Sequence, residues 1–333
     1  MQPQKKAILI ALCISIVLML AKFAAYFITG SNAILTDAAE SIVNVLASSF
    51  AFYSIYLSTR PKDENHPYGH GKVEFFSAFV EGVLIIFAGL IIIGKSGYDL
   101  IYPKEIGRLY EGAVIIGITG LVNLLVGYFL INTGRKHHSI TLEADGRHLL
   151  TDSVTSAGLV GGIILIQLTQ LWWLDGCISI LLGLYIIYTG YKLTRRSVGG
   201  LMDESNIDLV KDMVTIMQDH RKEYWIDIHN FRAQQYGADL HIDCHVTLPY
   251  YLDLQKIHQE ISEIDQLINR TALRRTELFI HADPCLPACC HYCQVRNCGV
   301  RQEAFQGEIR WTTENATKNQ KHFSQSTKRN ELF

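Results

Sequence analysis

Two pairs of polar side chains interrupt long apolar stretches of this chain. Glu40 and Asn44 stand four residues apart in one stretch, and His148 and Asp152 stand four residues apart in another. This spacing places both members of a pair on one face of a helix. Ionisable groups in bilayer-spanning helices face the bundle interior and tend to mark ion pathways. If the two faces meet, two carboxylates, an imidazole and an amide form a four-ligand site for a transition-metal ion.

The apolar stretches that carry these residues are long enough to cross a bilayer, which takes about 20 residues for a helix. Of the 333 residues, 49% are hydrophobic and only 19% are charged. The apolar residues dominate the first 200 positions and thin out afterwards. The sequence therefore predicts a six-helix transmembrane domain at 1–200, a cytoplasmic domain at 201–284 and an extension at 285–333. The predicted spans are roughly 7–29, 33–57, 73–101, 112–134, 141–169 and 172–194.

Basic residues predict the orientation of these spans, because cytoplasmic loops carry an excess of lysine and arginine. Both termini and the C-terminal domain are expected on the cytoplasmic side of a multi-pass integral membrane protein. The compact chain lacks a long histidine-rich loop, which suits a bacterial inner membrane. The basic residues that cluster on one side are Lys5, Lys6, Arg60, Lys62, Lys72, Arg135, Lys136, Arg195 and Arg196.

The segment 203–284 predicts an α-β-β-α-β order of elements. Helical periodicity marks 207–220 and 254–268, and a short strand is expected at 277–282. Residues 238–248 alternate apolar and polar side chains, the pattern of a strand with one buried face. This order predicts a small ferredoxin-like (metallochaperone-like) α+β layer, with helices on one face of a sheet.

The same segment is rich in histidine, which together with carboxylate suits zinc and its first-row neighbours. Two of the histidines fall on the polar face of the predicted strand at 238–248. A lone surface histidine is usually only a polar residue, but this number in one small domain favours metal binding. The candidates are His220, His229, His241, His245, His258 and His281, with Asp283 close behind.

Five of the eight cysteines crowd into a short segment after Asp283, namely Cys285, Cys289, Cys290, Cys293 and Cys298. Disulfides rarely persist in a reducing cytosol. We therefore expect reduced thiols or a soft-metal cluster, with zinc as the default ion. The paired C-x-x-C pattern of a zinc ribbon is absent, so an extension that binds no metal is the alternative. The polar residues 303–333 predict a disordered tail.

A short polar loop at 61–72 also gathers metal-ligand types. Asp63, His66 and His70 are candidates for a site at the cytoplasmic edge of the membrane. Pro67, Gly69 and Gly71 exclude a simple helix here. The alternative is a polar turn that caps the following helix.

Several motifs make the chain resemble the cation diffusion facilitator family over nearly its whole length, up to about Pro284. The H-P-Y-G-H-G-K string and the H-x-x-x-D of the fifth span are the most specific of them. The motifs are Gly30–Asp37, His66–Glu74, Ala144–Asp152 and His281–Pro284.

The resemblance implies a homodimer that exports a divalent transition metal from the cytoplasm in exchange for protons. No resident cofactor is expected. The other expected partners of the protein are the bilayer, the metal ions and protons. The resemblance assigns Glu40, Asn44, His148 and Asp152 to the transport site and Asp63, His66 and His70 to a loop site. It assigns His229, His245, His258, His281 and Asp283 to a cytoplasmic binuclear site, and Lys72 and Asp203 to a charge pair between subunits.

One position departs from the family pattern, in which the second-span pair is usually Asp or His followed by Asp. Here the pair is Glu40 and Asn44, so a neutral amide replaces a carboxylate. Zinc is the first choice of metal, and iron(II), manganese, cobalt and cadmium are alternatives. Asp37 lies on the same helix face and is a possible extra ligand, although capping of the helix start explains it more simply.

Two other function classes compete with a transporter. A membrane metalloprotease would need the helical H-E-x-x-H zinc motif, which is missing, so we do not expect an enzyme. A non-transporting membrane metal sensor would account for the histidines and cysteines of the C-terminal domain but has no need of ligands at mid-bilayer. Nucleic-acid binding is not expected, because the net charge is −2 and no basic patch with interleaved aromatics appears.

Overall fold

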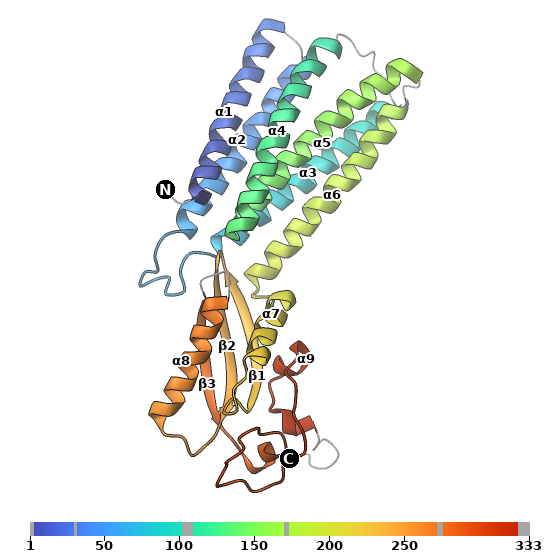
Figure 1. The fold of residues 1–333 in the computed structure, drawn as a ribbon. Helices are drawn as coiled ribbons and strands as arrows, with labels where there is room; N and C mark the ends of the chain where they lie inside the picture. Colours follow the sequence, from blue (N-terminus) through green and yellow to red (C-terminus); the bar gives the residue numbers. More distant parts are fainter. Residues whose placement is uncertain (1–2, 30–31, 102–108, 170–172, 272–275, 326–333) are drawn as a thin grey trace. The chain divides into compact units, whose positions relative to one another are not determined.

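The computed structural model describes residues 3–29, 32–101, 109–169, 173–271 and 276–325 (Figure 1). Internal contacts divide the chain into an N-terminal unit, Met1–Met202, and a C-terminal unit, Asp203–Phe333. Each unit has its own buried core, and each is described here by itself.

The N-terminal unit consists of six long helices, in agreement with the six predicted spans. They are α1 (Pro3–Thr29), α2 (Asn32–Ser58), α3 (Val73–Ile101), α4 (Leu109–His137), α5 (Ile140–Thr169) and α6 (Trp173–Leu201). Within the described residues, four have the length and hydropathy to cross a membrane: Pro3–Ala24, Val73–Tyr98, Gly117–His137 and Cys177–Leu201. The remaining two, α2 and α5, carry the predicted transport ligands, whose polarity lowers the mean hydropathy of a helix.

The six helices pack mainly in pairs, α1 with α2, α3 with α6 and α4 with α5. Glycines allow two of these pairs to approach closely. A Cβ atom added at Gly82 on α3 would stand 2.4 Å from Thr194 Oγ1, and one at Gly190 on α6 would stand 2.8 Å from the Gly82 carbonyl oxygen. The same holds for α4 and α5. A Cβ atom added at Gly127 on α4 would stand 2.9 Å from the Gly146 carbonyl oxygen, and one at Gly146 on α5 would stand 2.8 Å from the Gly127 carbonyl oxygen. Small residues at such contacts are the usual means of tight helix packing in membranes.

A buried carboxylate ties three segments together where α3 begins. Glu74, which is only 4% exposed, accepts hydrogen bonds from Ser139 Oγ (2.5 Å) and Ser58 Oγ (3.0 Å). Thr141 Oγ1 donates to the backbone carbonyl of the same residue at 3.2 Å. These bonds fix the ends of α2 and α5 against α3, next to the loop that carries the 61–72 ligands.

The C-terminal unit has the predicted α-β-β-α-β order. Its elements are α7 (Ile207–Asp219), β1 (Asp227–Tyr236), β2 (Asp239–Leu248), α8 (Leu254–Thr271) and β3 (Thr276–Pro284). β1 pairs antiparallel with β2 through a tight hairpin at Gly237, whose φ of +62° suits glycine. β2 pairs in parallel with β3, so β2 is the central strand.

The core of the C-terminal unit lies between the sheet and the helices. Ile242, Cys244 and Val246 on β2 pack with Met217 on α7 and Ile264 on α8, and all five are buried. The alternation predicted for β2 is therefore correct. His241 and His245 lie on the opposite face of the strand, away from the two helices.

The prediction of a disordered tail from residue 303 is wrong as far as residue 325. Trp311 and Ala316, in a segment that ends in α9 (Thr313–Ala316), are buried in the same core. The backbone N–H of Asn230 donates to the Lys318 carbonyl at 2.8 Å, and His322 is bonded to the buried Asp227. A single tryptophan and a few specific hydrogen bonds hold this otherwise polar segment, and composition alone does not reveal them. Residues 326–333 lie outside the described part of the chain.

Candidate metal-transport sites

Helices α2 and α5 bring together three of the four residues predicted for the transport site. Asn44 Nδ2 donates a hydrogen bond to Asp152 Oδ2 at 2.7 Å, and Asn44 Oδ1 lies 3.0 Å from His148 Nε2. His148 Nε2 and Asp152 Oδ2 are 4.0 Å apart. The amide thus bridges the imidazole and the carboxylate, and one nitrogen and two kinds of oxygen donor converge on one point.

Glu40 and Asp37 lie on α2, but their side chains are outside the described part of the structure. Glu40 is one helical turn before Asn44, on the same face of α2. Its role as the fourth ligand, and that of Asp37 as an extra ligand, remain predictions.

Two further carboxylates lie near this group. Sequence reasoning gave Asp145 no role and left Glu81, a polar residue of the third span, between helix packing and a proton path. Asp145, which is fully buried one turn before His148, accepts a hydrogen bond from Ser48 Oγ at 2.9 Å. Glu81 on α3 is 1% exposed, and among the described residues neither of its carboxylate oxygens has a hydrogen-bond partner. Glu81 is within electrostatic range of both Asp145 and Asp152. The spacing Asp145–His148–Asp152 on one helix face was the available signal for Asp145.

The loop between α2 and α3 forms the second predicted group. Asp63 Oδ1 lies 2.9 Å from His66 Nδ1 and accepts the His66 backbone N–H at 2.7 Å, while Asp63 Oδ2 lies 3.2 Å from His70 Nε2. One ligand atom from each residue falls within a 4.8 Å cluster. The hydrogen bond from His66 lowers the pKa of Asp63, with smaller contributions from the nearby imidazoles. The carboxylate is therefore ionised and available to a cation.

Three adjacent strands form the third group. His229 on β1 pairs with His245 on β2, which pairs with His281 on β3, so the three histidines form a row across the sheet. Asp283 holds the row together: its Oδ2 lies 3.2 Å from His229 Nε2 and 3.4 Å from His245 Nδ1, and its Oδ1 lies 3.6 Å from His281 Nε2. His229, His245 and Asp283 place ligand atoms within 4.8 Å of one another.

Burial controls the charge of the innermost member of this row. His229 is 4% exposed, and desolvation lowers its pKa in spite of the nearby Asp227 and Asp283 carboxylates. A neutral imidazole is the form that binds a metal ion.

His258 is the one predicted ligand of this site that the structure does not bring to the row. It is exposed on α8, which packs on the apolar face of the sheet, whereas the row lies on the opposite face. Its role stays a prediction. His241, which had no assigned role, instead pairs its Nδ1 with Glu277 Oε2 at 3.2 Å and contacts the Tyr236 ring.

The predicted charge pair of Lys72 and Asp203 is not tested by these contacts. Lys72 belongs to the N-terminal unit and Asp203 to the C-terminal unit, and the relative placement of the two units is not described.

Comparisons with known proteins agree with this division. A family model described as the cation efflux transmembrane domain matches residues 8–202, and one described as the cytoplasmic domain of cation efflux proteins matches residues 208–285. An uncharacterized transporter of Synechocystis sp. is 33% identical over 247 residues, covering 74% of this chain and 80% of the relative. The cation-efflux pump FieF of Shewanella oneidensis is 25% identical over 270 residues, covering 81% and 90%. FieF of Escherichia fergusonii is 27% identical over 297 residues, covering 84% and 92%.

Proposed function

Because this chain belongs to the cation diffusion facilitator family, a family of membrane-embedded divalent-metal efflux transporters and not enzymes, we propose that it exports Zn²⁺ from the cytoplasm in exchange for protons. The observation that carries the proposal is the convergence of Asn44, His148 and Asp152 from two helices. A metal ion would take the place of the hydrogen bonds that now join the three side chains.

Exchange with protons follows from the chemistry of the donors. Imidazole and carboxylate bind a metal ion only when deprotonated, so metal and protons compete for the same atoms. When the site faces the cytoplasm, the metal displaces protons from His148 and Asp152. When it faces the other side, protons displace the metal, and the inward proton gradient drives efflux.

Asp145 and Glu81 are two further carboxylates that can accept those protons. A buried carboxylate without a hydrogen-bond partner is costly while charged, and either a proton or a nearby cation reduces that cost. Glu81 is such a group. It lies on α3, within electrostatic range of Asp145 and Asp152 on the ligand-bearing helix α5. We assign the pair to the proton path and not to metal coordination.

The choice of metal rests on the donor set. One imidazole with amide and carboxylate oxygens suits zinc and is also compatible with iron(II), manganese, cobalt and cadmium. Zinc stays the first choice because nitrogen and oxygen ligands are sufficient for it. The neutral amide weakens the electrostatic attraction that a second carboxylate would supply.

The C-terminal unit is assigned to dimerisation and metal sensing. The match to a family model described as the cytoplasmic domain of cation efflux proteins supports a cytoplasmic position for its histidine row. Metal bound by His229, His245, His281 and Asp283 would neutralise clustered donors near a subunit interface. Such binding biases transport only by the difference in metal affinity between the two transport states.

Flux in proteoliposomes tests the transport proposal. Wild type and Asp152→Ala are compared with Zn²⁺, Fe²⁺, Mn²⁺, Co²⁺ and Cd²⁺, with a pH-sensitive dye inside the vesicles. Zinc flux with opposite proton movement, lost in Asp152→Ala, is the expected result. Thr133→Ala is the control and should transport normally, because among the described residues the Thr133 hydroxyl bonds only to the Phe129 carbonyl of its own helix. Metal binding without flux for any ion would favour a non-transporting sensor instead.

A further inference from the structure

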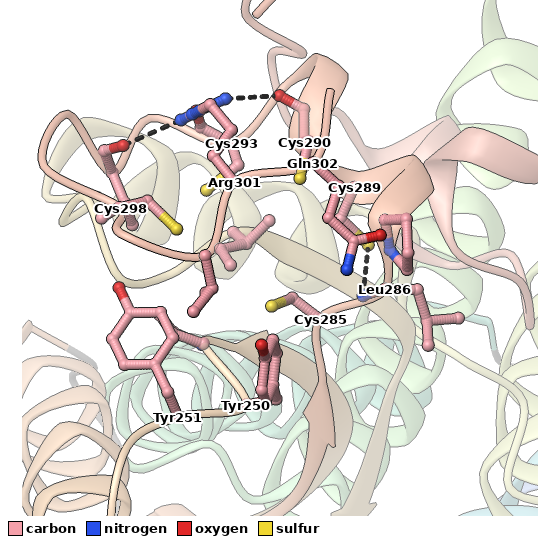
Figure 2. Close-up of a pocket in the computed structure, with 15 residues that line it drawn as sticks. Tyr250, Tyr251, Cys285, Leu286, Cys289, Cys290, Cys293, Cys298, Arg301 and Gln302 are labelled. Carbon is pink, nitrogen blue, oxygen red and sulfur yellow. Dashed lines mark hydrogen bonds between the residues drawn. The ribbon is translucent and has the colours of Figure 1, made fainter. Parts of the chain in front are cut away.

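Five thiols surround a small cavity in the C-terminal unit, and the proposed transport cycle makes no use of them. The cavity has a volume of about 30 Å³ and lies between the segment that follows β3 and the turn at Tyr250 and Tyr251 (Figure 2). We name the group the thiol cluster. Its members are Cys285, Cys289, Cys290, Cys293 and Cys298, all of them reduced.

A backbone hydrogen bond, a short helix and the contacts of one arginine bring these thiols together. Cys285 continues from β3 and is held by a backbone hydrogen bond to the Leu248 carbonyl at 2.9 Å. The short 3-10 helix η1 (Pro287–His291) then carries Cys289 and Cys290. The Arg301 guanidinium donates to the carbonyl oxygens of Cys290 (2.8 Å), Cys293 (3.0 Å) and Val295 (2.8 Å), so it closes the loop.

Sulfur is the main type of metal-donor atom on the walls of the cavity. Apart from the thiols they are formed mainly by apolar and aromatic side chains such as Ile226, Val295 and Val300. Tyr250, Tyr251 and Gln302 add side-chain oxygen atoms, and the guanidinium of Arg301 is occupied by backbone carbonyls. Cys285 interacts electrostatically with Cys289, Cys290 and Cys298, and Cys293 interacts with Cys285 and Cys298. The cavity therefore offers several sulfur donors and few others.

We propose that Cys285, Cys290, Cys293 and Cys298 bind a single Zn²⁺ ion that fixes the extension onto the C-terminal unit. Four thiolates in tetrahedral arrangement are a common structural zinc site, with Zn–S bonds of about 2.3 Å. In the structure the sulfurs surround the cavity at wider separations, and coordination would draw them inward. The segment from Cys285 to Arg301 has only one short helix of its own, so a metal crosslink would contribute directly to its stability.

Cys289 is assigned to packing and not to the metal. It is 1% exposed, and its sulfur accepts the Leu286 backbone N–H at 3.4 Å. The small buried cluster to which it belongs also includes Cys293, so the hydrogen bond to its sulfur is what distinguishes Cys289. Figure 2 shows this contact on the side of the cavity next to Leu286. Two adjacent cysteines with different roles thus provide a matched pair for an experiment.

Cobalt(II) substitution of the full-length protein under reducing conditions tests the proposal. Thiolate ligands give a sulfur-to-cobalt charge-transfer band, whereas the histidine and carboxylate sites of this chain cannot. We expect a band that saturates with one ion per chain and is abolished by added Zn²⁺. Cys290→Ser should lose the band, and Cys289→Ala should keep it. No band in the wild type, an equal loss in both variants, or iron–sulfur absorption in the isolated protein would overturn the assignment.

A second measurement does not depend on how well the variants fold. The wild-type protein is alkylated with a thiol reagent with and without Zn²⁺, and each cysteine is quantified by mass spectrometry. Zn²⁺ should protect Cys285, Cys290 and Cys298, which are partly exposed without it. Equal alkylation of these three in both conditions would refute zinc binding even if every variant were unstable.

Discussion

At the scale of single residues, Asn44 distinguishes the proposed transport site from the usual pattern of its family. Its amide uses both ends, donating to Asp152 and lying in hydrogen-bond distance of His148. The hydrogen bonds hold the two α5 ligands in place before any metal arrives. The amide therefore orients the site, while its oxygen contributes only a weak, uncharged ligand.

Asn44→Asp should strengthen zinc binding at the expense of release. The change adds a negative charge beside Asp152 and removes the Nδ2 donor, so the empty site becomes less stable and the occupied site more stable. We expect the zinc affinity to rise by about tenfold, roughly 1.4 kcal/mol, with a lower maximal flux. Calorimetric titration and vesicle flux measure the two quantities. An unchanged affinity would mean that residue 44 does not contact the metal.

His229 makes the stability of the metal-free protein depend on pH. Burial lowers its pKa in the folded state. As the pH falls, the unfolded chain therefore binds a proton at His229 before the folded chain does. The free energy of unfolding should therefore fall as the pH drops through the unfolded value of about 6.5. His229→Gln should reduce this slope between pH 7.5 and pH 5.5. Fluorescence of the buried Trp225 and Trp311, followed in chelator, reports the unfolding.

At the scale of helices and strands, the sequence predicted what is local and missed what depends on long-range pairing. The i, i+4 spacing located Asn44 and the α5 pair, and alternation located the polar face of β2. The row of His229, His245 and His281 depends on the register of three strands. This register is set by contacts between segments that are far apart in the sequence. Glu81 became relevant only when α3 was placed beside α5, and Trp311 only when the tail was placed on the core.

The glycine contact between α3 and α6 should be a sensitive point of the helical unit, because backbone atoms as well as a side chain lie close to it. In Gly82→Ala the new methyl group would meet Thr194 Oγ1 at 2.4 Å and its backbone nitrogen at 2.9 Å. Overpacking of this kind costs about 1–3 kcal/mol. Gly94→Ala on the same helix is the control, because nothing lies within 4 Å of its Cβ position. Thermal melting in detergent should separate the two variants, and equal melting temperatures would show that α6 adjusts without cost.

At the scale of the whole molecule, the two units have metal-ligand groups of different accessibility and purpose. The α2–α5 group is enclosed by helices, and in the loop group Asp63 and His66 are exposed while His70 is largely buried. The histidine row runs across one face of the sheet from the buried His229 to the exposed His281. A transport site must release its ion in every cycle, whereas a sensing site needs to hold its ion while the cytoplasmic concentration is high. Mutations in the two groups should therefore change different kinetic quantities.

His281→Ala should raise the metal concentration needed for half-maximal flux more than it lowers the maximal flux. The imidazole lies 3.6 Å from Asp283 Oδ1 and is 67% exposed, so its removal disturbs the sheet little while it removes a donor from the row. His220→Ala is the matched control, because within the described part of the chain the side chain of this exposed histidine at the end of α7 bonds only to the Ile216 carbonyl. Flux measured over a series of zinc concentrations distinguishes the cases. A proportional loss at all concentrations would assign the row to the transport path itself, and no change would leave it a structural cluster, because a sensor can shift transport only through the metal it binds.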